Sequence, residues 1–409
     1  MEMMNVKKYT YQWRALLLMV LAWGVAGLVH NCIAFLFPYF STMFDLKTSH
    51  NGYLTGTLAF FWTLSIIVFG PIADKIGQVR IMVPGLIMGG VALLFIAASH
   101  SVIMLYVLTA VTGFGCGSIV STSLSFLAEQ SNPKYRGLFF GAAQSSFTLI
   151  GSAIGAVFLT RLGDSIVGWR GCYIVLAMLV IIVAFSIFVF GRNIPRAVNL
   201  KQSHEKQSFT SLIRYKNIII STSLASLTMM WYFTVASFTI LYLIESKELS
   251  AVAAGGIFAG FGSGGFIGEF FAPFISDKLG RRTTTLFATF IGGICYAIFA
   301  QVSLSVIWMT FFLASASFFM SGAMAILNSV VPSESVPSHL VATATAFTPA
   351  CGELMGGVVA PVIAGGLTLV IEISQIMNLL IVIPCMVFVG ALFLRETSPI
   401  VLERRANKR

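Results

Sequence analysis

Charged residues are scarce in this chain. Of its 409 residues, 10% are Asp, Glu, Lys or Arg, whereas 57% are hydrophobic and the mean hydropathy is +0.91. Soluble domains carry about 25% charged residues and roughly 45–50% apolar ones. The composition therefore excludes a water-soluble fold and predicts an integral membrane protein.

Sequence patterns for cofactor, metal or nucleotide chemistry are also missing. The six Cys residues stand singly in apolar runs, with no Cys-x-x-Cys pair. The glycine-rich run at 262–268 lies inside an apolar stretch and is not followed by Gly-Lys-Ser/Thr, so no P-loop is present. Neither His-Glu-x-x-His nor Gly-x-Ser-x-Gly occurs. We therefore expect no cofactor, no bound metal, and neither an ATP-driven pump nor an intramembrane enzyme.

Apolar runs of membrane-spanning length are abundant instead. A transmembrane helix needs about 20 apolar residues, with a working range of roughly 17–25. Twelve stretches meet this requirement: 15–40, 52–72, 81–98, 102–128, 137–160, 171–190, 218–243, 253–275, 283–301, 306–330, 340–369 and 376–394. The chain is therefore predicted to be all-α, with twelve transmembrane helices.

The longest connection between these stretches divides the twelve spans into two sets of six. It runs from 191 to 217 and carries six of the basic residues. We predict a six-helix bundle at 1–190, a central loop at 191–217, and a second six-helix bundle with its tail at 218–409.

The basic residues follow the alternation of the loops. The net charge of +10 comes from 25 Lys and Arg residues against 15 Asp and Glu residues. When the loops alternate from a cytoplasmic start, all but four basic residues lie on the cytoplasmic side, the exceptions being Lys47, Arg161, Arg170 and Lys247. The positive-inside rule then places both termini in the cytoplasm. The positive charge reflects orientation, with attraction to lipid headgroups as a by-product, and no nucleic-acid partner is expected.

A short motif recurs after the second and eighth spans. Asp74-Lys75-Ile76-Gly77 is followed by Arg80, and 203 residues later Asp277-Lys278-Leu279-Gly280 is followed by Arg281 and Arg282. The two copies lie in equivalent loops of the two halves. Two six-helix halves related by an axis along the membrane normal are typical of transporters that rock around a central site.

At these residues the chain resembles the major facilitator superfamily. The family motif Gly-x-x-x-Asp-Arg/Lys-x-Gly-Arg-Arg/Lys matches Gly70, Asp74, Lys75, Gly77 and Arg80, with Gln78 in place of the first Arg. Its second copy matches Asp277, Lys278, Gly280, Arg281 and Arg282, with Pro273 where Gly is usual. The resemblance implies two six-helix bundles in which helices 1, 4, 7 and 10 line a cavity. It also implies that the motif residues latch the cytoplasmic side; the alternative is a pair of short turns with stop-transfer charges.

Two family features of exporters are absent. Many drug exporters, and some uptake members, carry an Arg in span 4, four residues before a Gly, and here that position is Thr109. The Gly-Pro motif of the exporters in span 5 is also missing, although Gly151 and Gly155 remain. Both differences argue against proton-driven drug export.

Ionisable and strongly polar residues inside the spans are few. A charged group at the centre of a span costs at least about 2.5–3.5 kcal/mol, so each is a candidate for function. The candidates for proton coupling or substrate contact are His30, Asn31, Gln144, Glu269 and Glu353. The unperturbed pKa of histidine, about 6.5, makes His30 a titrating candidate.

Each of these candidates has a structural alternative. Glu353 lies among prolines and glycines near the middle of span 11, where an apolar environment favours the neutral acid and permits proton loading; it could instead be a hydrogen-bonded structural carboxylate. Glu269 lies near the predicted cytoplasmic end of span 8 and could pair with a loop cation. His30 could form a helix-to-helix hydrogen bond. Trp231 and Tyr232 in span 7 are candidates either for substrate contact or for packing.

These patterns predict a monomeric secondary transporter in the inner membrane, working by alternating access with a small-molecule substrate and protons as its partners. The absence of the exporter motif and the buried carboxyl groups favour proton symport. No Lys or Arg lies inside a span, so a monocarboxylate or a neutral metabolite is favoured. An exporter of drugs or metabolites is the first alternative, and a non-transporting membrane sensor with this fold is the second.

Overall fold

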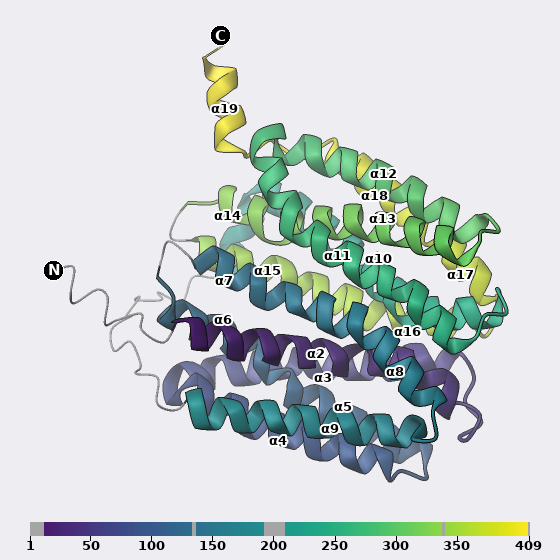
Figure 1. Ribbon diagram of the computed structural model, residues 1–409. Helices are drawn as coiled ribbons and strands as arrows, with labels where there is room; N and C mark the ends of the chain where they lie inside the picture. The colour runs from purple at the N-terminus through teal and green to yellow at the C-terminus, as the bar shows by residue number, and fades with distance from the viewer. Residues whose placement is uncertain (1–11, 133–135, 192–208, 338–339, 408–409) are drawn as a thin grey trace. The chain divides into compact units, whose positions relative to one another are not determined.

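Long helices make up nearly all of the computed structural model, which describes residues 12–132, 136–191, 209–337 and 340–407 (Figure 1). The structure is 87% helical, and the described residues contain no strand. A helix pairs its own backbone groups, which is what a chain needs where lipid offers no hydrogen bonds. The predicted all-α fold is confirmed.

Twelve helices are long and apolar enough to cross a membrane, as the sequence predicted. Their bounds lie close to the predicted ones: Gln12–Phe40, Ser49–Ala73, Gln78–Ala97, Val102–Leu127, Leu138–Asp164, Gly168–Gly191, Lys216–Glu245, Ala251–Leu279, Arg281–Gln301, Val306–Glu334, Thr343–Leu367 and Ile373–Ala391. We refer to them as spans 1 to 12.

The chain forms two units. Unit 1 comprises residues 1–46 and 57–202, and unit 2 comprises residues 47–56 and 203–409. The elements of the first six spans are α2 (Gln12–Phe40), α3 (Ser49–Ile76), α4 (Gln78–Ala97), α5 (Val102–Cys116), α6 (Ser118–Gln130), α7 (Arg136–Ser146), η1 (Phe147–Ile154), α8 (Gly155–Asp164), α9 (Gly168–Ser186) and η2 (Ile187–Gly191).

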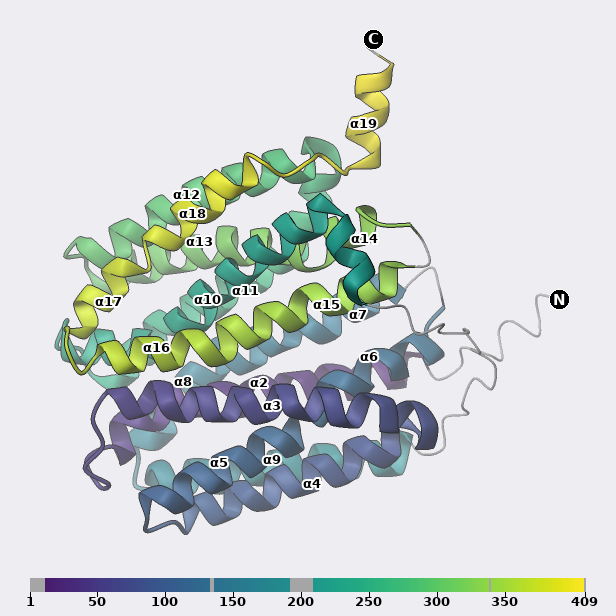
Figure 2. The same ribbon diagram turned by 180° about the vertical axis from the view of Figure 1, so that it is seen from behind.

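The remaining elements all belong to unit 2. They are η3 (Phe209–Arg214), α10 (Lys216–Glu245), α11 (Ala251–Leu279), α12 (Arg281–Gln301), α13 (Val306–Ala325), η4 (Ile326–Val330), α14 (Val331–Glu334), α15 (Val341–Glu353), η6 (Leu354–Val359), α16 (Ala360–Leu367), α17 (Ile373–Leu379), α18 (Val382–Ala391) and α19 (Pro399–Ala406). Seen from behind, α15 and α16 continue one another as a single rod (Figure 2).

Helices within unit 2 approach closely where glycines replace larger side chains. A Cβ atom on Gly264 of α11 would lie 2.0 Å from the Ala314 carbonyl oxygen of α13, and one on Gly268 would lie 2.0 Å from that of Phe318. Helix packing therefore accounts for the glycine-rich run at 262–268. The long contact between α11 and α13 is the result.

The first two turns of α3 belong to unit 2, although the rest of the helix belongs to unit 1. The Asn51 side chain is fully buried and donates to the Ser237 carbonyl of α10 over 2.7 Å, and Thr48 Oγ1 donates to Glu245 over 3.0 Å. A Cβ atom on Gly52 would lie 2.1 Å from the Pro361 carbonyl oxygen of α16. The start of span 2 is thus hydrogen-bonded to span 7 and packed closely against span 11.

Backbone turns repeat at the same distance along the chain as the motif. Gly77 and Gly280 begin α4 and α12 with φ of 111° and 99°, values that favour glycine. The two non-glycine residues with positive φ in the described part of the chain, Asp45 (50°) and Glu248 (54°), are also 203 residues apart. The turns before and after span 2 therefore recur before and after span 8.

Candidate functional site

His30 lies among aromatic rings inside unit 1. Its imidazole ring, on α2, meets the Trp62 ring of α3 edge-on with 5.5 Å between centroids, and the Phe147 ring with 5.6 Å. Phe147 is the first residue of η1, a π-helical segment in span 5. Only 3% of the His30 surface is exposed. The histidine therefore contacts two other spans of its unit, through their aromatic side chains.

Asn31 joins α2 to the same π-helical segment. Its Nδ2 atom donates to the Gly27 carbonyl over 2.9 Å and to Ser152 Oγ, in η1, over 3.4 Å. At this crossing the backbones touch, because a Cβ atom on Gly27 would lie 3.0 Å from Gly151 Cα. Asn31 thus makes the kind of helix-to-helix hydrogen bond that was the structural alternative for its neighbour His30.

Gln144 and Glu353 each lie close to the point where an α-helical part of their span gives way to a π-helical one. Gln144 is an exposed residue of α7, three positions before η1 begins. Glu353 is the last residue of α15, directly before the π-helical η6. π-helical segments are rare, and they occur frequently at functional sites. The two predicted residues therefore mark the same change of helix type in the two halves.

Glu353 is partly buried beside α10. The glycines on either side of it let the helices approach: a Cβ atom on Gly352 would lie 2.3 Å from the Met229 sulfur, and one on Gly356 would lie 2.6 Å from the Met229 carbonyl carbon. The carboxyl group thus sits near the middle of span 11, where two helix backbones are close together. Glu269 is also partly buried, on α11, eight residues before Asp277.

Trp231 and Tyr232 belong to an aromatic cluster inside unit 2. The Trp231 ring is fully buried and meets Tyr296 of α12 with 5.2 Å between centroids. Tyr232 packs on Phe261 of α11 at 5.1 Å, and Trp231 lies 6.0 Å from the same ring. The indole Nε1 of Trp231 has no hydrogen-bond partner among the described residues. In this structure both side chains pack within their own unit.

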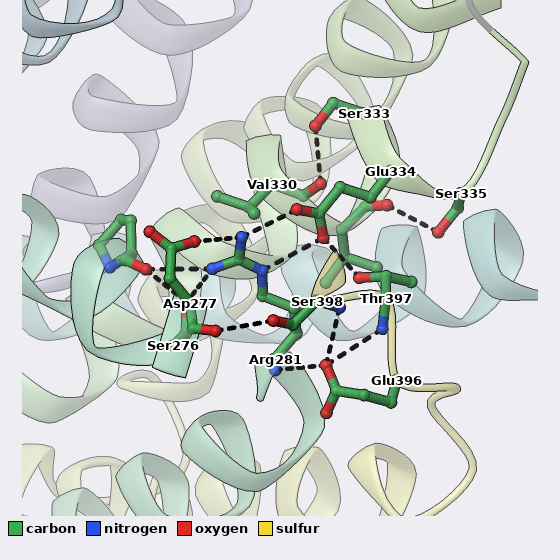
Figure 3. A network of polar contacts seen from close by, with 12 residues as sticks. Ser276, Asp277, Arg281, Val330, Ser333, Glu334, Ser335, Glu396, Thr397 and Ser398 are labelled. Atoms are coloured by element: carbon green, nitrogen blue, oxygen red, sulfur yellow. Dashed lines mark hydrogen bonds and ion pairs between the residues drawn. The ribbon is translucent and has the colours of Figure 1, made fainter. Parts of the chain in front are cut away.

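The second copy of the motif forms a charged network around Arg281 (Figure 3). The guanidinium group binds Glu334 with both carboxylate oxygens, Nη2 to Oε1 over 2.8 Å and Nε to Oε2 over 3.2 Å, and it also pairs with Asp277. It donates further to the Pro273 carbonyl over 3.0 Å. Planar, two-point pairing of this kind is the stronger form of ion pair. The predicted gating residues Asp277 and Arg281 are therefore in contact.

Glu396, which follows span 12, completes this network. Its carboxylate accepts hydrogen bonds from the backbone N–H of Arg281 over 2.7 Å and of Ser398 over 2.9 Å. The first turn of α12 has no cap from its own N-cap residue, Gly280. The carboxylate supplies both the missing acceptor and a negative charge at the positive end of the helix dipole.

The first copy of the motif is built differently. Gln78 is buried, and its Nε2 atom donates to Glu129 over 2.9 Å. Arg80 is exposed and donates to the Ile76 carbonyl over 3.5 Å, while Lys75 is exposed. The side chain of Asp74 lies outside the described residues. A hydrogen bond from an uncharged amide to a carboxylate thus stands in unit 1 where unit 2 has an ion pair.

Of the remaining motif residues, Arg282 makes a side-chain hydrogen bond, whereas a side chain at Gly70 would meet its nearest neighbour at an ordinary packing distance. Gly70 lies within α3, with Ser121 as the nearest neighbour of a Cβ atom at 3.8 Å. Lys278 and Arg282 are exposed, and Arg282 Nη2 donates to the Leu392 carbonyl over 2.7 Å. Neither Glu334 nor Glu396 was among the predicted site residues, and Glu396 lies outside the repeated motif.

The described residues contain no group of three or more His, Cys, Asp and Glu side chains able to hold a metal ion. What the arrangement offers is a set of single polar residues in apolar surroundings at the helix crossings, and a charged network at one end of unit 2. This arrangement is suited to binding a solute and to conformational change.

Comparison with known sequences identifies a family. The sequence model described as Major Facilitator Superfamily matches residues 18–361. A "Probable hexose phosphate transport protein" of Chlamydia muridarum is 24% identical over 307 residues, which cover 68% of this chain and 67% of the relative. A "Cis,cis-muconate transport protein" of Acinetobacter baylyi is 27% identical over 348 residues, 79% of each chain.

Comparison with solved structures finds the same fold. A bacterial homologue of the human lysosomal transporter Spinster, described as inward-facing and unoccupied, superposes with a TM-score of 0.79. Its sequence is 18% identical, and the match covers 94% of this chain and 97% of the other. At this sequence identity the structural similarity supports a conclusion about the fold alone.

Proposed function

The chain belongs to the major facilitator superfamily, whose members are transporters, and on that premise we propose that it imports a small organic solute together with protons. In this proposal both termini are cytoplasmic, the protein lies in the inner membrane of a bacterial cell, and it acts as a monomer. Its mechanism is alternating access.

The observation that carries the proposal is the position of Glu353. It is an acidic residue in the middle of an apolar span, at the junction of α15 with a π-helical segment, and pressed against α10. Holding an ionised carboxylate there is costly, so the neutral and charged forms differ strongly in their surroundings. A group whose charge depends on its surroundings can take a proton on one side of the membrane and release it on the other.

Three features support a small solute carried inward. Relatives of this chain are named for transport of cis,cis-muconate and hexose phosphate, both of them small organic solutes. The spans contain Thr109 instead of the Arg that many exporters carry. Every Lys or Arg within a span lies in the four residues at one of its ends, so none stands near the middle of the membrane, which favours a monocarboxylate or a neutral metabolite over a solute with several negative charges.

The test is uptake into proteoliposomes by wild-type protein and by Glu353→Gln. The probes are lactate, cis,cis-muconate, glucose 6-phosphate and glucose, each with and without a proton gradient directed inward. For a probe that the wild type accumulates, we expect Glu353→Gln to lose accumulation driven by the gradient but to keep exchange of labelled for unlabelled solute. Glu372→Gln removes the same charge at an exposed position between spans 11 and 12 and should keep both activities.

Three outcomes would contradict the proposal. Gradient-driven uptake by Glu353→Gln with an unchanged pH dependence would show that this residue carries no coupling proton. Net export from cells, measured for the same probe, would favour the exporter. Binding of a probe without exchange in proteoliposomes would favour a sensor.

A further inference from the structure

The last helix, α19, runs in a different direction from the spans of unit 2. In both views its axis makes a steep angle with the axes of α12 and α18, and the helix projects away from the unit beyond their ends (Figure 1 and Figure 2). Its root is fixed, because Ser398 Oγ donates to the Asp277 carbonyl over 2.8 Å and Glu396 binds the start of α12. A helix anchored where spans end, and lying across their direction, follows the membrane surface instead of crossing it.

Apolar side chains are exposed along this helix and just before it. The exposed fractions are 43% for Ile400 and 46% for Leu402, which point to opposite sides of the first turn of α19, and 66% for Phe393, two residues after the end of α18. Side chains of this kind insert at the boundary between headgroups and acyl chains when a helix lies on a bilayer. The first turn of α19 is therefore suited to contact with lipid.

Basic residues surround the same end of unit 2. Lys278, Arg282, Arg395 and Arg404 are exposed there, and we call these four residues the basic rim. Arg405 follows within α19, and Lys408 and Arg409 come after it in the sequence, outside the described residues. Clusters of four to eight Lys and Arg residues next to a transmembrane helix attract anionic lipids.

We propose that α19 and the basic rim form a binding surface for anionic phospholipid headgroups, on which α19 lies along the membrane with its first turn inserted. The charge of the surface, its exposed apolar residues and its direction all fit this one ligand. The proposal rests on the orientation given under the proposed function, which makes this face cytoplasmic. The residues just before α19 form hydrogen bonds with Asp277 and with the start of α12. In this proposal the lipid-binding surface therefore adjoins the network around Arg281.

The test uses the full-length protein in nanodiscs, without substrate. One set contains phosphatidylcholine alone, and the other contains three parts phosphatidylcholine to one part phosphatidylglycerol. Backbone amide exchange is followed across residues 399–407 by mass spectrometry. We expect exchange to be about tenfold slower in the anionic discs, and the difference to shrink in high salt because screening weakens surface attraction.

Two variants with equal change of charge complete the experiment. K278Q/R282Q/R395Q/R404Q, which neutralises the basic rim, should exchange at the phosphatidylcholine rate in both discs. R192Q/R196Q/K201Q/K206Q, in the central connection, should keep the wild-type difference. Amides within α12 report whether each variant is folded, since they should exchange as in the wild type.

Equal exchange of α19 in the two lipids would overturn the proposal. So would loss of the difference in the central-connection variant, since net charge and not α19 would then be responsible. Slow exchange in phosphatidylcholine that is insensitive to salt would show that α19 is held by protein, again overturning it. Because no transport is measured, a failure here leaves solute uptake standing, and a protein that transports nothing can still show lipid-dependent protection.

Discussion

Gln78 and Arg281 stand 203 residues apart at the same place in the repeated motif, yet Gln78 binds a carboxylate through a neutral amide and Arg281 forms an ion pair. Gln78 donates to Glu129 over 2.9 Å, whereas Arg281 binds Glu334 with both carboxylate oxygens. Both contacts join the loop after the second helix of a half to the end of the fourth. The contact in unit 2 is the stronger of the two, because it pairs opposite charges through two parallel hydrogen bonds, whereas Gln78 offers the carboxylate a single uncharged donor.

Replacing Arg281 by Gln should therefore destabilise the protein. The substitution removes the charged partner of Glu334, and each hydrogen bond to a charged group contributes about 1.5–3 kcal/mol. Because Glu334 and Asp277 retain some contact with water, we expect a loss of about 2 kcal/mol in the free energy of unfolding. Thermal unfolding of purified protein, followed by tryptophan fluorescence, measures it. Lys278→Gln, an exposed cation three residues away, is the control, and an equal loss in both variants would contradict the assignment.

Glu396→Gln should loosen the start of α12. The amide side chain keeps an oxygen acceptor but loses the negative charge that faces the amino-terminal end of the helix. A charge at a helix terminus contributes about 0.3–1 kcal/mol, so the backbone amides of Arg281 and Arg282 should exchange several-fold faster. Amide exchange by mass spectrometry tests this. Glu403→Gln, on exposed α19, removes an equal charge and should leave these amides unchanged; equal acceleration in both would refute the capping role.

Gly365→Ala should break the contact between the first turn of α3 and the second turn of α16. Its new Cβ atom would lie 2.7 Å from the Ser49 carbonyl oxygen and 3.1 Å from Gly52 Cα, both backbone atoms. Overpacking of this kind costs typically about 1–3 kcal/mol, and we expect faster amide exchange across residues 49–56.

The neighbouring glycine provides a matched control for that substitution. A Cβ atom on Gly366 would find its nearest neighbour, the Tyr53 hydroxyl oxygen, at an ordinary 3.6 Å. Gly366→Ala therefore gains the same helix propensity without the collision. If both variants exchange alike at 49–56, the close approach at Gly365 does not hold α3 in place.

The sequence predicted the number of spans and the paired motif, because membrane thickness fixes the length of an apolar helix and the repeat is visible in the letters. It did not predict the π-helical segments beginning at Phe147 and Leu354. These depend on a shift of backbone hydrogen bonding by one residue, which leaves no periodic signature in the side chains.

Contacts that depend on the fold could not be predicted from the sequence either. Asn31 was recognised as a polar residue in a span, but its bond to Ser152 requires knowing that spans 1 and 5 touch. Glu396 follows the last span in a segment with no repeat, so nothing in its surroundings indicated that it binds the start of α12. The assignment of residues 47–56 to unit 2 likewise follows from contacts with spans 7 and 11.

The recurrence of turn geometry at both ends of one span bears on how this chain arose. Asp45 and Gly77 bracket span 2, and Glu248 and Gly280 bracket span 8, with the same number of residues between them in each case. Few of the intervening residues are identical, so side chains have diverged while length has not. Tandem duplication of an ancestral gene for six helices would leave this trace. Since its two copies parted, span 2 and span 8 have tolerated exchange of residues but no net insertion or deletion.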